Sequence, residues 1–363
     1  MHTEQRDRAH DLLRSRNIDR ALFANPYSVT WLTGFAEPLQ VGPGPFAGGP
    51  PLVWYEDGTF TLLVLESLDT SSVSIPVIRY PGYTIETPLP GPAQLTKIVG
   101  ELVGKGEFVA EMQALPAGFL PPRAGPLPID GWLAPLRMVK TGEELAKLRA
   151  AFALADVAHI AAAQAVRVGA REIDVWAAAH SAVQQQGGQR IPFGNDCVVS
   201  YRENNIGGWP GDLALRAGDS LMMDISTRVH GYWSDSCNTY YAADVTPRQK
   251  AMRHTAAEAL EFAISLVKPG IPANEIDRRV RAFIAEAGYP VYPHHTGHGV
   301  GASSHEEPRI VPYNATPLEP GMVTMLEPGI YFPREAAVRL EDAVLVTADG
   351  ADIMTGHLKR PLY

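Results

Sequence analysis

Cysteine is nearly absent from this sequence, which has only Cys197 and Cys237 among its 363 residues. Two cysteines cannot form the disulfide framework of a small secreted domain, and they suit a reducing compartment. The segment 1–20 lacks the apolar core of a signal peptide, and no apolar run reaches the roughly eighteen residues that a membrane-spanning helix needs. We therefore expect a cytoplasmic protein without a membrane span.

Clustered positive charge is also missing. The chain has 31 Lys and Arg against 40 Asp and Glu, a net charge of −9 and a pI of about 5.7. A surface of this sign repels nucleic acid and anionic lipid, so we expect neither as a partner and favour small solutes. With 45% hydrophobic residues, a chain of 363 residues can build two domains with separate cores.

The first part of the chain alternates strand-like and helical segments, which predicts a small α/β domain over residues 1–135. The segments 20–35 and 50–66 combine short apolar runs with turn residues and are predicted as strands. Between them, residues 36–51 are so rich in Gly and Pro that neither helix nor strand can continue. Pro135 ends this part of the chain.

From residue 136 to 363 long helical segments alternate with strand-rich ones, which predicts an α+β domain of helices packed on antiparallel sheets. Thr141 and Glu144 have the spacing of a capping box at the start of the first helix. Pro or Gly residues mark the ends of the other three expected helices. The expected helices are 141–169, 172–186, 247–267 and 272–287.

Two pairs of carboxylates are placed symmetrically about turn sequences. Asp224 and Asp235 flank the turn residues 229–231, so pairing about that turn brings the two carboxylates opposite each other to within one or two residues. Glu327 and Glu341 are equidistant from Arg334 in a second turn. Two such hairpins can converge on one site.

A histidine lies between the two pairs. His298 stands in the sequence HHTGHGVG, where the flanking glycines leave space around an imidazole. Four carboxylates and one imidazole can hold two divalent cations a few Å apart, because bridging carboxylates offset the repulsion between the metals. The pattern therefore favours a dinuclear metal centre, while an isolated Asp or Glu near a turn is more often a solvated surface group.

These motifs together resemble a known family. HTGHGVG followed by His305 and Glu306, then MLEPGIYF and VRLED, with GDSLMMDISTRVHGYWSD before them, is similar to the signature of the pita-bread metallopeptidases. That group includes Xaa-Pro dipeptidases (prolidases), aminopeptidases P, methionyl aminopeptidases and creatinase. The resemblance covers residues 136–350, and ALFANPYSVTWLTGF resembles the start of the family's N-terminal domain.

The resemblance implies a catalytic pita-bread domain over 136–363, preceded by a creatinase-type α/β domain over 1–135. It also implies a role for each site residue. Asp224 would bind one metal, Asp235 and Glu341 would bridge both, and His298 and Glu327 would complete the second. Glu327 would also be the general base. His305 and His294 match histidines that contact the substrate, and Arg339 matches an arginine that braces the bridging carboxylates near the substrate.

The implied cofactors are two divalent ions, with Mn²⁺ or Co²⁺ favoured by the mostly oxygen ligands and Zn²⁺ as an alternative. Such a pair activates a water for attack on a peptide bond. We expect a dinuclear peptidase that removes the N-terminal residue of dipeptides or short peptides, with Xaa-Pro substrates preferred. Two alternatives stay open: the same fold with a non-Pro specificity, and a creatinase-like hydrolase or lyase of a small molecule.

Two departures from the family pattern concern specificity. Its prolidases carry a further histidine before the first Asp ligand, whereas this sequence has no histidine between His180 and His230 and places Gly207 and Gly208 there. Cys237 also stands where the family has a threonine. Finally, the Gly/Pro-rich stretch 40–50, with Phe46, is an unusual solvated loop but a reasonable dimerisation arm, which predicts a homodimer.

Overall fold

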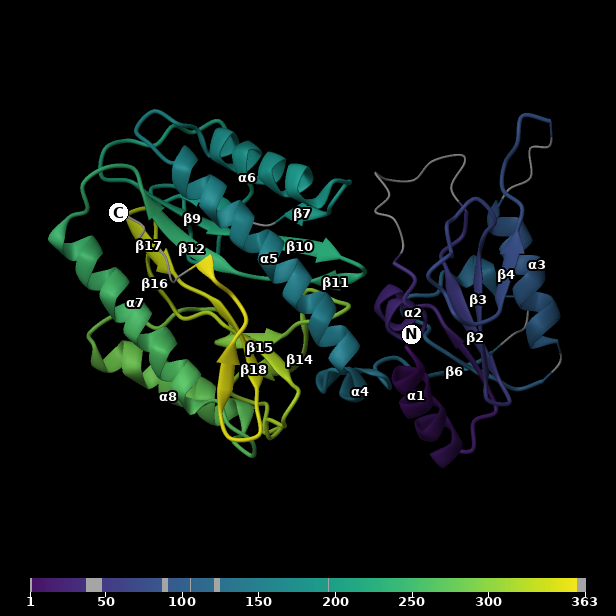
Figure 1. Cartoon of the computed structure of the whole chain (residues 1–363). Coiled ribbons are helices and arrows are strands. Elements are labelled where there is room, and N and C mark those ends of the chain that lie inside the picture. The colour runs from purple at the N-terminus through teal and green to yellow at the C-terminus, as the bar shows by residue number, and fades with distance from the viewer. Residues whose placement is uncertain are drawn as a thin grey trace. The chain divides into compact units, whose positions relative to one another are not determined.

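The computed structural model describes residues 2–36, 48–86, 91–104, 106–120, 125–194 and 196–357. The chain divides into two compact units, residues 1–137 and 138–363, which are described separately below (Figure 1). The sequence-based boundary at Pro135 lies two residues before this division. No helix among the described residues is long and apolar enough to cross a membrane.

The first unit is built on one mixed six-stranded sheet with the strand order β4-β3-β2-β1-β5-β6. The pairs β1–β2 and β2–β3 are antiparallel, and the other three pairs are parallel. Its strands are β1 (Arg20–Phe23), β2 (Leu52–Glu56), β3 (Thr59–Leu65), β4 (Val77–Tyr80), β5 (Val109–Ala110) and β6 (Leu127–Pro128). Its helices are α1 (Thr3–Ser15), α2 (Pro26–Thr33), α3 (Gly91–Val103), the 3₁₀ turn Ala117–Phe119 and α4 (Ala134–Met138), which runs into the division.

The strand predicted over residues 20–35 is wrong in its second half. Only β1 is a strand, and residues 26–33 form helix α2. Asn25 caps this helix by accepting a hydrogen bond from the Tyr27 amide, and Pro26 occupies its first turn. Six of its eight residues are buried. A helix that is covered on nearly every side has no polar face, so its sequence lacks helical periodicity.

The second unit begins with α5 (Gly142–Ala165), whose capping box between Thr141 and Glu144 is formed as predicted. The helix ends at Ala165 instead of Gly169, because Val166 has an extended backbone. The other three predicted helices lie within one or two residues of their expected bounds. They are α6 (Glu172–Gly187), α7 (Pro247–Leu266) and α8 (Ala273–Glu286).

Four small antiparallel sheets make up the rest of this unit, with the orders β11-β10-β7, β12-β9-β8, β14-β13-β15-β18-β19 and β16-β17. The early strands are β7 (Phe193–Gly194), β8 (Cys197–Val199), β9 (Ser220–Asp224), β10 (Ser226–Val229), β11 (Tyr232–Trp233) and β12 (Cys237–Tyr241). The late strands are β13 (Gly297–Gly299), β14 (Glu306–Ile310), β15 (Val323–Leu326), β16 (Gly329–Phe332), β17 (Ala336–Arg339), β18 (Asp342–Val346) and β19 (Ala351–Ile353).

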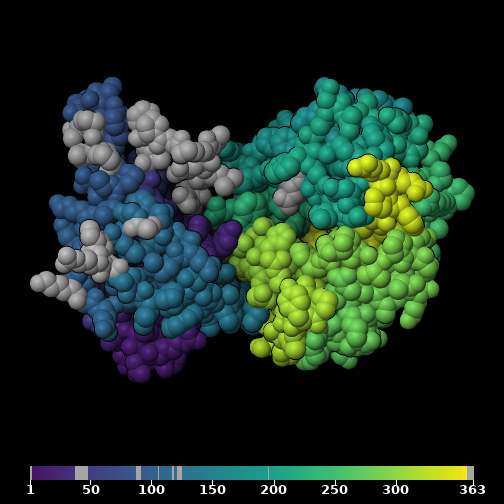
Figure 2. Space-filling view, turned by 180° about the vertical axis from the view of Figure 1, so that it is seen from behind, coloured from purple at the N-terminus to yellow at the C-terminus, as the bar shows by residue number. Residues whose placement is uncertain are grey.

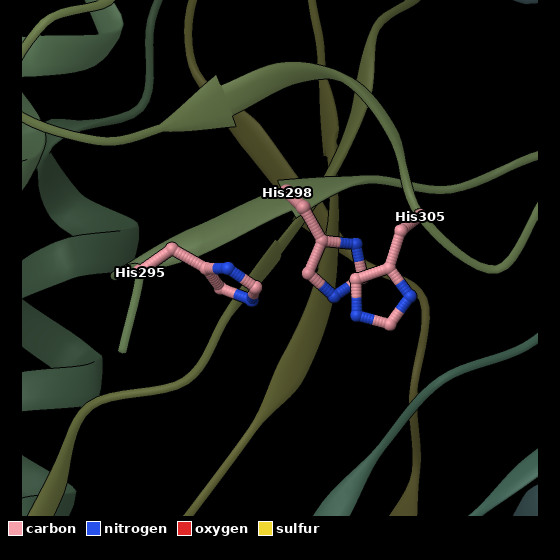
Figure 3. Close-up of side chains that lie close together, drawn as sticks. All are labelled: His295, His298 and His305. Atoms are coloured by element: carbon pink, nitrogen blue, oxygen red, sulfur yellow. The ribbon is translucent and has the colours of Figure 1, made fainter. Parts of the chain in front are cut away.

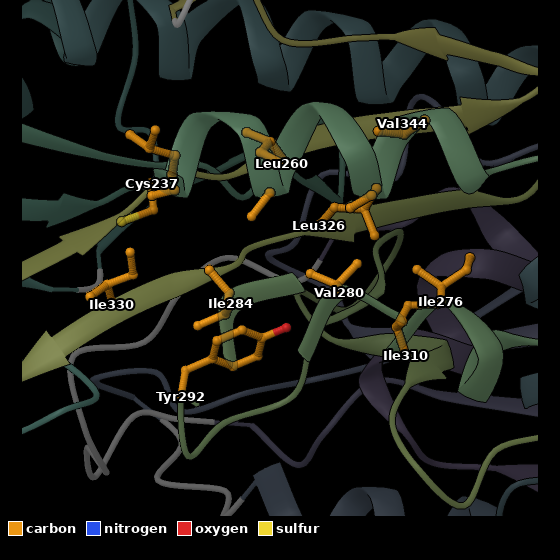
Figure 4. Packing of buried hydrophobic residues seen from close by; sticks show 14 of the residues in the cluster. Cys237, Leu260, Ile276, Val280, Ile284, Tyr292, Ile310, Leu326, Ile330 and Val344 are labelled. Carbon is orange, nitrogen blue, oxygen red and sulfur yellow. The ribbon is translucent and has the colours of Figure 1, made fainter. Parts of the chain in front are cut away.

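Helices α7 and α8 cover the late strands through the largest apolar cluster of the unit (Figure 4). Its members on the helices are aliphatic side chains that are almost fully buried, and they meet side chains from β14, β15, β16 and β18. The labelled residues are Cys237, Leu260, Ile276, Val280, Ile284, Tyr292, Ile310, Leu326, Ile330 and Val344. In the view from behind, the last described residues lie at the surface of this unit beside both its teal and its green segments (Figure 2). The packing of α7 and α8 holds in place the late strands that carry the predicted ligands.

Candidate metal centre

The first pair of carboxylates is presented by strands β9 and β12. These strands pair antiparallel with Asp224 opposite Cys237, so Asp235 lies two residues from the position opposite Asp224. Between β9 and β12 in the chain, β10 and β11 are joined by a turn with positive φ at His230 and Gly231, as a two-residue hairpin requires. Asp235 accepts a hydrogen bond from the Ser226 hydroxyl at 3.0 Å. The register agrees with the sequence-based expectation.

The second pair is in direct register. Strand β15 pairs with β18 so that Leu326 lies opposite Asp342, which places the next residues, Glu327 and Glu341, opposite each other. The Glu327 amide donates to the Thr296 carbonyl at 2.9 Å. The Glu341 amide donates to the Cys237 carbonyl at 3.0 Å, and this bond ties the second hairpin to the first.

His298 lies at the centre of strand β13, between β14 and β15. A Cβ atom at Gly297 would come within 1.9 Å of the Met325 carbonyl oxygen, and one at Gly299 within 2.2 Å of the Glu307 carbonyl oxygen. The glycines are therefore required by the adjacent backbones. This reason differs from the space for the imidazole that the sequence suggested.

These elements bring the predicted ligands together. The Nε2 atom of His298 lies 3.7 Å from an oxygen of Asp235, 3.7 Å from Glu327 and 4.0 Å from Glu341. All four side chains are buried. Asp235, His298 and Glu341 each offer a ligand atom within 4.8 Å of the others. Asp224 approaches from the end of β9, where it is partly buried.

Arg339 connects Asp224 to its surroundings. Its guanidinium donates to Asp224 at 2.6 Å and to Asp196 at 3.4 Å, and its other terminal nitrogen donates to the Ile206 carbonyl at 2.5 Å. Asp196 was not singled out from the sequence. Its carbonyl accepts from the Asp224 amide at 3.0 Å, and this long-range pairing brings it to the site.

The electrostatics of the carboxylates fit a bound cation. Burial, followed by repulsion from neighbouring carboxylates, raises the pKa of Asp235 and of Glu341. Burial opposes ionisation of Glu327, but His295, whose Nε2 lies 2.8 Å from a Glu327 oxygen, and the other nearby histidines outweigh it, so the pKa of Glu327 is lowered. Buried oxygens of Asp224 and Glu341 have no hydrogen-bond partner among the described residues. Divalent ions would satisfy these oxygens and relieve the repulsion.

The histidines around His298 differ in how they are held (Figure 3). His305 stacks on His298 with ring centres 3.9 Å apart and 16° between the planes. His294 uses both ring nitrogens within the protein, at 2.8 Å from the His295 carbonyl and 2.8 Å from the Tyr331 hydroxyl. His295 places Nε2 at 2.8 Å from a Glu327 oxygen. Burial lowers the pKa of His298 to about 3, so its ring is neutral, as a metal ligand must be.

The segment that lacks the family's histidine is held tightly. Gly207 has a φ of 150°, and a Cβ there would lie 1.7 Å from an Asp196 oxygen, so no side chain fits. Gly208 has no such strain. Arg202 donates to the buried Glu172 carboxylate at 2.9 Å and to the Trp209 carbonyl at 2.6 Å. The guanidinium is therefore already bound by two acceptors.

Cys237, which replaces the family's threonine, is buried and unreactive, because burial raises the pKa of its thiol well above the ordinary value. Two residues after Cys237, Thr239 does carry a hydroxyl. It donates to the Arg339 carbonyl at 3.2 Å and accepts from the Arg339 amide at 3.1 Å. The strand that follows Asp235 is thus fixed to the strand that precedes Glu341.

Comparison with known proteins agrees with this architecture. An Xaa-Pro dipeptidase of Pyrococcus horikoshii is 29% identical over 353 residues, which cover 95% of each chain. A Bacillus subtilis relative is 36% identical over 224 residues, and this match spans 61% of the present chain and 62% of that protein's length. The crystal structure of the prolidase from Pyrococcus horikoshii has a TM-score of 0.84 at 28% identity and covers 98% of each chain, which confirms the expected pita-bread fold.

The profile of metallopeptidase family M24 matches residues 146–348, more than half of the chain and all of the residues around His298 described above. The chain therefore belongs to metallopeptidase family M24.

Proposed function

We propose that this protein is a dinuclear metal-dependent peptidase that hydrolyses the N-terminal peptide bond of dipeptides or short peptides, with Xaa-Pro substrates preferred. The observation that carries the proposal is the convergence of Asp235, Glu327 and Glu341 on the Nε2 atom of His298 at 3.7 to 4.0 Å. The relative from Pyrococcus horikoshii named as an Xaa-Pro dipeptidase supports the substrate class.

In this proposal Asp224 would hold one ion, Asp235 and Glu341 would serve both ions, and His298 and Glu327 would complete the second. The unpartnered oxygens of Asp224 and Glu341 support it. Mn²⁺ and Co²⁺ suit a mainly oxygen donor set, with Zn²⁺ as the alternative. Arg339 braces Asp224 through the 2.6 Å hydrogen bond and so orients its remaining oxygen.

Bound ions of this kind lower the pKa of a water and polarise the scissile carbonyl. Glu327 is the general base in our proposal, because its lowered pKa keeps it ionised and able to accept a proton. His305 donates to the carbonyl oxygen as negative charge develops there. Burial lowers the pKa of His294 to about 4, so that ring is neutral when it borders the substrate.

The segment 203–210 favours a second candidate on the same fold, a peptidase with a non-Pro specificity or a creatinase-like enzyme acting on a small molecule. Gly207 and Gly208 offer the substrate no side-chain donor, and Arg202 is already bound to Glu172. A substrate pocket that lacks the family's additional histidine discriminates less between substrates.

We also propose that the protein is a homodimer formed through the stretch 40–50. Residues 40–47 lie outside the described residues, so the proposal rests on their Gly- and Pro-rich composition. Light scattering of the intact chain and of a variant without residues 40–50 tests it, with a dimer expected for the first and a monomer for the second. A monomer in both preparations contradicts the proposal.

The activity is tested with metal-depleted protein reloaded with Mn²⁺ and offered Ala-Pro, Ala-Ala, a longer Xaa-Pro peptide and creatine. We expect Ala-Pro hydrolysis that disappears with a chelator and returns with the ion. Turnover of Ala-Ala at a similar rate supports the non-Pro candidate, and turnover of creatine alone supports the creatinase-like one. A protein that binds two ions and hydrolyses none of these substrates contradicts the proposal.

A further inference from the structure

His295 borders the metal centre, yet neither the sequence motifs nor the proposed function gives it a role. Its Nε2 atom lies 2.8 Å from an oxygen of Glu327, the same oxygen that is 3.7 Å from His298 Nε2. The preceding residue cannot take this place, because both ring nitrogens of His294 are held by the His295 carbonyl and the Tyr331 hydroxyl. His294 Nδ1 lies 3.7 Å from the other oxygen of Glu327, so of the two consecutive histidines His295 is the one whose nitrogen is closer to the centre.

The ring geometry distinguishes His295 from His305. Two imidazoles bound to one ion at tetrahedral or right angles have ring centres roughly 4.5–5.2 Å apart, given a metal–nitrogen distance of about 2.1 Å. The rings of His295 and His298 are 5.1 Å apart and inclined by 74°. His305 instead lies 3.9 Å from His298 and nearly parallel to it, which is a stacking contact. Figure 3 shows the His295 ring turned toward His298 from the opposite side to His305.

The spacing of the donor atoms is close to that of ligands sharing one ion. Neighbouring ligand atoms around one ion are about 3.0–3.5 Å apart when each is about 2.1 Å from the metal. The 2.8 Å between His295 Nε2 and Glu327 and the 3.7 Å between His298 Nε2 and Glu327 lie on either side of this range. Ring nitrogens of His295, His298 and His305 all lie within 4.8 Å of one another, and the ring geometry above is what distinguishes His295 from His305.

We propose that His295 is a sixth protein ligand of the centre, a second imidazole for the ion held by His298 and Glu327. This inference rests on the proposed function, because it needs that ion. One ion then has two nitrogen donors, while the other has only carboxylates. Because imidazole favours late first-row metals, the two positions differ in preference: the two-histidine position selects Co²⁺ or Zn²⁺ over Mn²⁺.

A hydrogen bond from His295 to Glu327 is the competing explanation of the 2.8 Å distance. The two roles separate in His295→Gln, because the glutamine amide reaches as far as Nε2 and donates to a carboxylate but lacks the imidazole lone pair. His294→Gln is the matched control, since it makes the same change one residue away in a ring already bound within the protein. His295→Ala removes both roles.

The experiment uses metal-depleted full-length wild type and the three variants, each checked for folding by circular dichroism. Co²⁺ and Mn²⁺ are titrated separately by calorimetry, and the Co²⁺ titration is also followed by visible absorption. At one of the two metal positions, we expect His295→Gln and His295→Ala to bind Co²⁺ about tenfold or more weakly than wild type. The loss of Mn²⁺ affinity should be smaller. The Co²⁺ absorption bands should change with the lost nitrogen, and His294→Gln should match wild type.

Wild-type Co²⁺ affinities and spectrum in folded His295→Gln would overturn the inference and leave His295 as a hydrogen-bond partner of Glu327. An equal loss in His294→Gln would also overturn it, because the effect would not be specific to His295. These failures differ from failure of the proposed function, in which the wild type itself binds no pair of ions or hydrolyses no peptide.

Discussion

The carboxylates at the two ends of the predicted metal centre have different neighbours. At the Asp224 end a buried arginine, Arg339, donates to two carboxylates, Asp224 and Asp196. At the Glu327 end the neighbouring groups are imidazoles, with His295 at 2.8 Å and His298 at 3.7 Å. We refer to these as the arginine end and the histidine end.

The difference bears on the departure from the family pattern that the sequence indicates. The resembled prolidases carry an additional histidine in the segment that here contains Gly207, and this segment lies at the arginine end, where Gly207 contacts Asp196. The neighbouring Ile206 carbonyl is bound by Arg339. The histidine end has His295. A guanidinium at one end and imidazole nitrogens at the other predict that the two metal positions differ in affinity and preference.

The two carboxylates proposed to bridge the ions should show the largest effect, because in the proposal they serve both ends. We expect Asp235→Asn or Glu341→Gln to abolish metal retention and activity together, with losses beyond the roughly 10–100-fold typical of residues that only support ligands. Metal content by mass spectrometry and kcat/KM for Ala-Pro measure both. Retention of two ions by either variant would show that it does not bridge.

His305→Ala should separate chemistry from metal binding at the histidine end. His305 stacks on His298, and we propose that it acts only as charge develops on the substrate. We expect kcat to fall by about a hundredfold while both ions stay bound. If the variant loses metal as completely as Asp235→Asn, His305 is a ligand and its assignment here is wrong.

Arg339→Lys tests the arginine end. Lysine keeps the charge, but it cannot reach Asp224, Asp196 and Ile206 with separate nitrogens of one planar group. We expect the ion held by Asp224 to bind about 10–100-fold more weakly, with the other ion less affected. Calorimetric titration of the metal-depleted protein measures this. Equal weakening of both ions would mean that the ends are not independent.

Asp196, at the arginine end, should make the stability of the folded protein depend on pH. Burial, with repulsion from Asp224, raises the pKa of Asp196 to about 6 from the ordinary 3.8. Since the folded state holds this proton more tightly than the unfolded chain, the wild type loses stability as pH rises from about 4 through 6. Asp196→Asn should escape this loss. In metal-depleted protein we expect its stability advantage in urea unfolding to grow by about 1 kcal/mol between about pH 5 and pH 7.5. A constant difference would contradict the prediction.

Gly208→His should give the smallest effect, a change in specificity. A Cβ at Gly208 would lie 3.0 Å from a terminal nitrogen of Arg202, so the bound guanidinium must move by only a few tenths of an ångström and the variant should fold. We expect the wild type to prefer Pro after the scissile bond less than the variant does, measured as kcat/KM for matched Xaa-Pro and Xaa-Xaa dipeptides. Gly207→Ala is the control for strain and should lose about 1 kcal/mol or more, because its φ of 150° suits only glycine. A strict Pro requirement shared by wild type and Gly208→His would contradict this hypothesis.

The parts of the fold that follow local rules could be predicted from the sequence. The Thr141–Glu144 capping box marks the start of α5, and the spacing of Asp224 and Asp235 about their turn gives the register of β9 and β12 to within two residues. Helix α2 could not be predicted in this way, because its buried faces leave no polar stripe. The motifs that resemble the family, more than composition, gave the order of the ligands along the chain.

The supporting contacts of the site depend on pairings between distant residues, which no local pattern reveals. Asp196 reaches Arg339 across 143 positions. Glu172 accepts a hydrogen bond from Arg202, 30 positions later in the chain. From the local sequence alone, Glu172 would be a solvated residue at a helix start and Arg202 a solvated loop residue. The ligand assignments and their roles stay predictions that the variants above test.

The glycines of strand β13 have a consequence for mutational scans. Because Gly297 and Gly299 lie against the carbonyls of Met325 and Glu307, any side chain at either position would push His298 out of line with the carboxylates. A scan scored by activity would rank both glycines with the ligands, although neither can bind an ion or touch a substrate through a side chain. Intolerance to substitution at these positions therefore reports how closely the backbones pack around His298. It does not identify a residue that takes part in the chemistry.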